Sequence, residues 1–278
     1  TILSNNLPDD IYTIAVEKSY LSLKKYEELK ALYRNSSFVN IETFIHEERK
    51  QKTLEEIKYV KKAIEITEKG LKNTLEKVIP GITELQIKAE LEYQLTLLGA
   101  EGLAFDTVVL SGERSALPHG SSSGKEIKEG ELLLFDLGVR VNGYHSDITR
   151  TFIVGKGNEK QKEIYEVVKA ANERAIEAVK IGIPLKNIDL AGRKYIEAQG
   201  YGQYFTHRIG HGLGLDVHEQ PSIHQENEDK VEKGLLFTIE PGIYIPSIGG
   251  VRIEDNIYVK ENGEVEVLTS FPKTLMEI

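Results

Sequence analysis

The chain of 278 residues contains no cysteine, no long apolar run and no excess of basic residues. Without cysteine there is no disulfide, no thiolate metal ligand and no cysteine nucleophile. No apolar run approaches the roughly 18 residues that a membrane helix needs. The formal net charge of −9 argues against nucleic acid or an anionic membrane as partner. The opening TILSNNLPDD has neither the basic start nor the apolar core of a signal peptide. These absences predict a cytoplasmic protein.

The length and composition predict one large domain and a smaller piece. The chain is 40% apolar and 28% charged, as in ordinary globular proteins. Residues 1–52 are weakly patterned, with a helix expected at 18–32, a short apolar stretch at 38–45 and a solvated linker at 46–52. About fifty residues are too few to fold well alone. We therefore expect a small N-terminal segment at 1–52 and the main domain at 53–278.

Helices and strands alternate in blocks along the main domain. The capping boxes Thr53-x-x-Glu56 and Thr83-x-x-Gln86 predict two helices, which end at Pro80-Gly81 and near residue 99. Strands are expected at 105–110, 132–141 and 144–154, a second helix pair at 159–179 and 185–199, and further strands from 235 onward. Helix, helix and strands thus occur twice, which predicts an α+β fold.

The two blocks also align with each other. At an offset of 101 residues the same residue type recurs in four places: Gly81 and Gly182, Ile82 and Ile183, Ile87 and Ile188, Gly99 and Gly200. This agreement in residue type and element order favours an internal duplication. Such a duplication would bring two sheets together and place a central cleft at their junction, where functional sites tend to lie.

Two aspartates flank the turn signal Asn142-Gly143. If those two residues form a hairpin loop, residue 141 pairs with 144 and Gly138 lies opposite Asp147. Asp136 is then the diagonal neighbour of Asp147 on the same face, at about 7–8 Å. Gly138 would leave room for an ion between them. Strand aspartates are usually just solvated, but the apolar run at 132–135 indicates burial, and a buried carboxylate needs a partner.

A second cluster of metal-type donors follows at 207–254. Its members are set among glycines: His207, His211, His218, Glu240 and Glu254. Together with the two aspartates they suit one or two divalent ions. A three-histidine zinc site is the alternative, and it leaves the four carboxylates unexplained. Arg252 shares a strand face with Glu254, so it forms either a plain salt bridge or a site for a substrate carboxylate.

Five motifs of this chain resemble those of one enzyme family. They are FDLG at 135–138, HSDITRTF at 145–152, HRIGHGLGLDVHEQP at 207–221, IEPGIYI at 239–245 and VRIEDN at 251–256. In this order and spacing they are similar to the pita-bread metallopeptidases, and within them to the Xaa-Pro dipeptidase (prolidase) and Xaa-Pro aminopeptidase branch. The resemblance covers roughly residues 53–278 and implies the pita-bread fold, in which helix-helix-strand units are duplicated around a central cleft.

The resemblance also implies roles for individual residues. It implies a site for two divalent metal ions, manganese or cobalt in most members and zinc or iron in some, with the ligands Asp136, Asp147, His211, Glu240 and Glu254. Asp147 and Glu254 would bridge the ions, and Glu240 would also carry the proton of the attacking water. It further implies His119 and His218 as catalytic histidines, and His207, Arg252 and Tyr244 as substrate-binding residues.

The implied reaction is hydrolysis of the Xaa-Pro bond of a dipeptide or a peptide N-terminus by a metal-bridging hydroxide. A methionine aminopeptidase would share the five ligands but does not usually carry a histidine four residues before His211, so His207 favours the proline-specific branch. A non-catalytic, protein-binding relative would typically lose ligands. Relatives carry a longer N-terminal domain that helps form dimers. We therefore expect a homodimer, with residues 1–52 as the tail of a domain whose remainder is missing.

Overall fold

The computed structural model describes residues 11–278, which divide into a unit up to Arg49 and a unit from Lys50 to Ile278. In the first unit, β1 (Thr13–Val16) and β2 (Ser37–Asn40) pair in parallel and are connected through α2 (Leu23–Leu32). The helix α3 (Glu42–Lys50) follows β2. Whether this unit is the tail of a longer domain stays a prediction.

Two expectations for this part of the chain need correction. The helix expected at 18–32 begins only at Leu23, because the hydroxyl of Ser22 caps it by accepting from the N–H of Lys25 at 3.3 Å. The solvated linker expected at 46–52 is wrong, since residues up to 50 belong to α3. The run is charged, but Glu, Arg and Lys are also good helix formers. At its end Lys52 is buried and forms an ion pair with Glu219 at 2.6 Å.

The second unit starts with the two predicted helices. Both capping boxes are present, and they begin α4 (Leu54–Leu75) and α5 (Glu84–Leu97). The helices pack on two small antiparallel sheets. One orders β4 (Val108–Ser111), β5 (Leu132–Leu137) and β8 (Ile148–Ile153). The other orders β3 (Gly102–Leu103), β6 (Val139–Val141) and β7 (Tyr144–His145), and the 3-10 helix η1 (Gly112–Ala116) follows β4.

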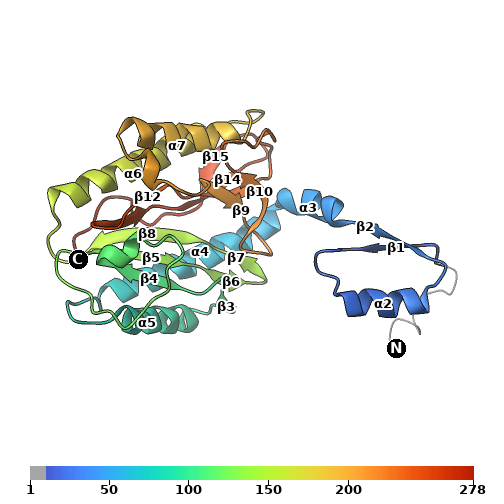
Figure 1. Cartoon of the computed structure of the whole chain (residues 1–278), viewed down its shortest axis with the longest axis horizontal. Coiled ribbons are helices and arrows are strands. Elements are labelled where there is room, and N and C mark those ends of the chain that lie inside the picture. The colour runs from blue at the N-terminus through green and yellow to red at the C-terminus, as the bar shows by residue number, and fades with distance from the viewer. Residues whose placement is uncertain (1–10) are drawn as a thin grey trace. The chain divides into compact units, whose positions relative to one another are not determined.

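The other half repeats this plan with α6 (Glu159–Glu177) and α7 (Lys186–Ala198). The short 3-10 helix η2 (Gly202–Tyr204) leads into a five-stranded sheet, whose strands lie in the order β10 (Glu219–Ile223), β9 (Gly210–Gly212), β11 (Leu236–Ile239), β14 (Asp255–Val259) and β15 (Val265–Val267). The hairpin of β12 (Gly242–Ile245) and β13 (Gly249–Arg252) stands apart. Figure 1 shows α6 and α7 along one side of the strands and α5 along the opposite side. This is the expected α+β pita-bread architecture.

The duplication extends to the backbone hydrogen bonds. Gly81 N donates to Ile127 O at 2.8 Å, and Gly182 N donates to Val231 O at the same distance in the second half. Gly81 and Gly182 both adopt a positive φ, 95° and 83°, as expected for glycines that end a helical segment. The two halves therefore share local geometry at the entrance to the second helix of each pair.

The predicted hairpin is confirmed in its register. Val141 pairs with Tyr144 across Asn142-Gly143, which both have positive φ as a two-residue loop requires. The expected role of Gly138 changes, however. A Cβ there would lie 2.0 Å from the carbonyl oxygen of Ser146, so this glycine permits close backbone approach rather than space for an ion.

The domain buries three apolar clusters. One joins α4 and α5 to β4, β5, β6 and β8, and another joins α6 and α7 to β10–β14 and includes Leu132 of β5 and Ile153 of β8. The third packs α4 against β8, β11 and β14, so the two halves share part of their core. Within residues 11–278 no helix is both long and apolar enough to cross a membrane.

Candidate metal centre

Strand ends and loops from both halves bring five metal-type side chains together. Three overlapping groups have their ligand atoms within 4.8 Å of one another: Asp147, His211 and His218; His211, Glu240 and Glu254; and Asp136, Asp147 and Glu254. Asp136 lies in β5, His211 in β9 and Glu240 directly after β11. All five predicted metal ligands are thus neighbours, and His218 is a sixth donor beside them.

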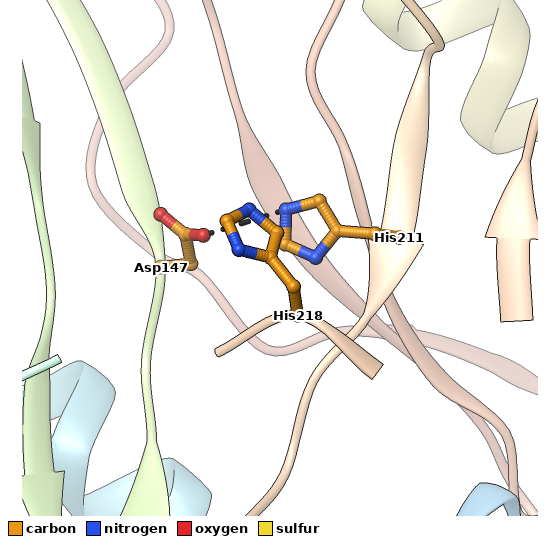
Figure 2. A group of neighbouring side chains, drawn as sticks. All are labelled: Asp147, His211 and His218. Atoms are coloured by element: carbon orange, nitrogen blue, oxygen red, sulfur yellow. Dashed lines mark ion pairs between the residues drawn. The ribbon is translucent and has the colours of Figure 1, made fainter. Parts of the chain in front are cut away.

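Figure 2 shows how Asp147, His211 and His218 face one another across the site. Asp147 comes from the chain between β7 and β8, and His218 lies just before β10. The Nε2 atom of His211 is 3.5 Å from Oδ2 of Asp147, and the two imidazole centroids are 4.3 Å apart. His218 was predicted to face substrate, and its contact with His211 places it at the edge of the metal-type cluster.

His211 is oriented as a metal-binding histidine would be. Its Nδ1 lies 3.0 Å from the carbonyl oxygen of Gly212, which can only accept, so Nδ1 carries the proton. Nε2 is left with its lone pair toward Asp147 and toward Glu240, whose Oε1 is 3.4 Å away. Burial, reinforced by the nearby His218, lowers the pKa of His211 to about 3. A neutral imidazole with a fixed tautomer is the form that binds metal.

The carboxylates of the site are crowded and buried. Burial and the neighbouring Glu254 and Asp136 raise the pKa of Asp147 well above its ordinary value. Burial also raises the pKa of Glu240 to about 7, although the positive charge of Arg252 opposes the shift. Burial and the negative charges of Glu240 and Asp136 also raise the pKa of Glu254 well above its ordinary value. So many buried like charges are unfavourable unless cations neutralise them.

One oxygen of this cluster has no hydrogen-bond partner. Oε1 of Glu254 is buried and unpartnered among the described residues, whereas Oε2 accepts from the hydroxyl of Thr149 at 2.7 Å. A buried, unpaired carboxylate oxygen that faces other carboxylates fits a divalent cation. The donor set, four carboxylates and a neutral imidazole, suits hard to borderline divalent ions. The residues therefore fit the metal ions that the sequence implies.

Arg252 connects the cluster to the substrate-binding residues expected from the sequence. Its guanidinium donates to Oδ2 of Asp136 at 2.6 Å, to the hydroxyl of Tyr244 at 2.9 Å and to the hydroxyl of Thr149 at 3.0 Å. Tyr244 in turn donates to Nε2 of His207 at 2.8 Å, because Nδ1 of His207 already donates to the carbonyl of Arg208. A hydrogen-bond chain thus runs from His207 to a predicted metal ligand.

A pocket of about 340 Å³ opens onto the cluster. All ten residues that the sequence singled out line it: His119, Asp136, Asp147, His207, His211, His218, Glu240, Tyr244, Arg252 and Glu254. His119 reaches it from the loop after η1, and Phe105, Pro118 and Gly120 add wall on the same side. The volume is within the range of small-ligand sites, which suits a short peptide.

Sequence reasoning missed two charged residues of the pocket: Asp106, which pairs with Lys88, and Arg208. The half-buried guanidinium of Arg208 donates to the hydroxyl of Ser222 at 3.1 Å. Among the described residues no carboxylate lies within ion-pair distance of it. Its positive charge lowers the pKa of both His218 and Glu240, although burial is the largest influence on each. The signal that could have found Arg208 is its place directly after His207.

The fold and the site define the class of protein, a pita-bread hydrolase with a metal-binding cleft. The profile of the family Peptidase_M24, metallopeptidase family M24, matches residues 58–261, and the chain belongs to this family. It is 46% identical over 262 residues to a Xaa-Pro dipeptidase of Pyrococcus furiosus, covering 92% of this chain and 75% of the relative. It is 45% identical over 266 residues to "Putative dipeptidase YkvY" of Bacillus subtilis, covering 96% of this chain and 73% of the relative.

Solved structures give the same picture. An X-Pro aminopeptidase from Thermotoga maritima superposes with a TM-score of 0.95 at 38% identity, covering 100% of this chain and 79% of that one. The prolidase from Pyrococcus furiosus superposes with a TM-score of 0.88 at 46% identity, covering 93% of this chain and 76% of that one. The chain is therefore a metallopeptidase of the expected branch, and its relatives carry both names between which the sequence did not decide.

Proposed function

We propose that this metallopeptidase hydrolyses the bond before proline at the N-terminus of short peptides, with two divalent metal ions. The carrying observation is the convergence of Asp136, Asp147, His211, Glu240 and Glu254 at the base of a pocket walled by histidines. Manganese or cobalt is our first expectation, and zinc or iron the second. When bound, two such ions would activate water and polarise the carbonyl of the scissile bond.

The surrounding side chains would hold the substrate and move protons. Glu240, whose pKa burial raises to about 7, would take a proton from the attacking water and return it to the leaving proline nitrogen. His218 would donate a hydrogen bond to the developing oxyanion, and His119 would contact substrate from the opposite loop. A proline nitrogen in peptide linkage carries no N–H, so the pocket needs no acceptor there.

We assign the recognition of the substrate's far end to the pocket's guanidinium groups. Arg252 and His207 remain the substrate-binding residues expected from the sequence, with Tyr244 between them. Arg252 already binds Asp136, and this leaves Arg208 with more donors directed to the pocket. A carboxylate is the group that a guanidinium pairs with most strongly. A free C-terminal carboxylate near Arg208 would favour dipeptides.

The function is tested with the metal-reconstituted protein on three substrates. We expect hydrolysis of a Xaa-Pro dipeptide and compare it with a Xaa-Pro tripeptide, which separates dipeptidase from aminopeptidase. A Met-Ala peptide serves as the substrate of the rival methionine aminopeptidase activity. Cleavage of Met-Ala but of neither proline substrate would overturn the proposal. Metal binding without any hydrolysis would favour the non-catalytic, protein-binding alternative.

Cellular setting and assembly belong to the same proposal. We extend the proposal to a cytoplasmic peptidase, and the net charge of −9 disfavours binding to an anionic membrane or to nucleic acid. A homodimer is expected from the resemblance to proline-specific relatives. Sedimentation or light scattering measures the oligomeric state directly.

A further inference from the structure

Glu84, the first residue of α5, is a fully buried carboxylate outside the candidate metal centre. Its Oε1 accepts from the N–H and the hydroxyl of Ser111 at 2.8 and 3.0 Å. Its Oε2 accepts from the N–H and the hydroxyl of Ser123, both at 2.9 Å. Arg114 adds its Nε at 3.1 Å from Oε2. One side chain thus ties together both ends of the segment 111–123, called here the His119 loop.

His119 depends on this loop for its position. It lines the pocket, yet among the described residues its exposed side chain has no hydrogen bond or ion pair of its own. Only the backbone places it, through a turn in which Gly120 N donates to Leu117 O at 3.0 Å. Arg114 supports the same turn by donating to the carbonyl of Ser121 at 2.6 Å. The contacts that fix the backbone of the loop therefore also fix the position of His119.

The second half of the domain carries an apolar side chain at the position that repeats Glu84. Glu84 N donates to Lys125 O at 3.0 Å, and at the repeated position Leu185 N donates to Asp229 O at 2.7 Å. Leu185 is 1% exposed, so the same backbone position buries an apolar side chain there. A buried charge seldom stabilises a fold more than apolar packing does. The carboxylate occurs in the half that carries the His119 loop.

We propose that Glu84 is a positioning residue that holds His119 at the substrate pocket by clamping both ends of its loop. The inference rests on the proposed function, because the position of His119 matters only if the pocket binds substrate. Reacting groups must be held within a fraction of an ångström, and supporting residues behind them provide this rigidity. Glu84 touches none of the five predicted metal ligands.

The test begins with Glu84→Gln in the full chain. The amide keeps the size but replaces one acceptor oxygen with a donor, which then faces the donors of Ser111 or Ser123. We expect kcat on a Xaa-Pro dipeptide to fall by about 10–100-fold, the cost of a misplacement near 1 Å. Metal stoichiometry should stay unchanged. Glu92→Gln is the matched control, since Glu92 lies on the same helix and, among the described residues, its carboxylate forms one ion pair, with Lys88 at 3.8 Å.

A double-mutant cycle separates positioning from general damage. If Glu84 acts through His119, Glu84→Gln combined with His119→Ala should have the kcat of His119→Ala alone. Losses that multiply in the double variant would overturn the proposal. Should Glu84→Gln fail to fold, Ser123→Ala removes a single hydroxyl donor and enters the same cycle with a smaller expected loss.

Hydrogen exchange of the metal-free protein tests the clamp without substrate. Amides in the His119 loop should exchange faster in Glu84→Gln than in wild type, and Glu92→Gln should leave them unchanged. Unchanged exchange in Glu84→Gln would overturn the clamp. If the wild type hydrolyses no Xaa-Pro substrate, the proposed function fails even where the exchange result supports the clamp, so the two failures are distinguishable.

Discussion

At the candidate metal centre, single side chains are oriented by hydrogen-bond and ion-pair partners. His211 is fixed by the carbonyl of Gly212, and Arg252 holds Asp136 through a short ion pair. The residue types and their order were predictable, because donor side chains set among glycines mark such sites in sequence. The partners were not predictable, since no sequence pattern marks Thr149 or Glu84 before the fold brings them beside a metal ligand or a loop.

His211→Ala is expected to abolish metal-dependent hydrolysis while keeping the fold. The imidazole is the only neutral ligand of the predicted set, and its Nε2 faces both Asp147 and Glu240. Metal affinity should fall by more than about 100-fold, the upper range for loss of a mere supporting partner. Metal titration by calorimetry and circular dichroism measure the two parts. Unchanged metal affinity would remove His211 from the ligand set.

Arg208→Met tests the recognition of a free substrate carboxylate. A hydrogen bond to a charged group contributes about 1.5–3 kcal/mol, so KM for a Xaa-Pro dipeptide should rise about 10-fold or more. KM for the corresponding Xaa-Pro amide, which lacks the charge, should change little. Arg208→Lys should recover part of the loss because the charge remains. Equal effects on acid and amide would contradict this role for Arg208.

Among the secondary-structure elements, those with strong local signals were predicted best. The capping boxes that start α4 and α5 and the turn that closes the hairpin of β6 and β7 are determined by a few adjacent residues. The expected strand at 132–141 is instead broken into β5 and β6 at Gly138. The break arises from the close approach of Ser146, a contact that no local pattern encodes. The mistaken linker at 46–52 had the same origin, because charge alone does not distinguish an exposed helix from a loop.

Gly138→Ala is expected to disturb the metal centre through this strand break. The added Cβ would meet the backbone oxygen of Ser146 at 2.0 Å, and Ser146 precedes Asp147. Overpacking of this kind costs about 1–3 kcal/mol, and relieving it must displace Asp147. Urea unfolding and metal titration should both report the change. Gly124→Ala is the control, since a Cβ there meets nothing within 4 Å.

At the scale of the whole molecule, the duplication explains why the site lies where it does. Residues from both halves line the shared pocket. Both halves hold a histidine segment with a buried acid and an arginine: Glu84 with Arg114 for His119, and Asp189 with Arg193 for His207. Arg193 also donates to the carbonyl of His207 at 2.7 Å. The second helix of each pair thus carries a buried acid that supports a histidine segment of the same pocket.

The charge of the site also couples metal binding to the stability of the domain. In metal-free protein the folded-state pKa of Glu240 is about 7, raised from its ordinary value of 4.5 chiefly by burial, and those of Asp147 and Glu254 are raised too. A raised pKa means that the folded state binds the proton more tightly, so stability is lost as pH rises through the folded pKa. The buried histidines act oppositely. His207 and His211, with pKa values near 4 and 3, reduce stability as pH falls through 6.5, the ordinary pKa that they have in the unfolded state.

Between pH 6.5 and 8.5 the two histidines, which lose their protons in the unfolded state, add about 0.8 kcal/mol of stability together, so the downward slope depends on all three raised carboxylates and not on Glu240 alone. Chelator-treated protein should lose about 1 kcal/mol across this window from Glu240 alone, and Asp147 and Glu254 act in the same direction. Saturating manganese should raise the melting temperature and remove the downward slope, because the ions bind the deprotonated carboxylates of the folded state. Calorimetry at several pH values, with and without metal, measures both. Glu240→Gln should lessen the decrease of stability with pH in the metal-free protein. If the stability of the metal-free wild type instead rises with pH in this window, these carboxylates are not the buried, mutually repelling cluster described above.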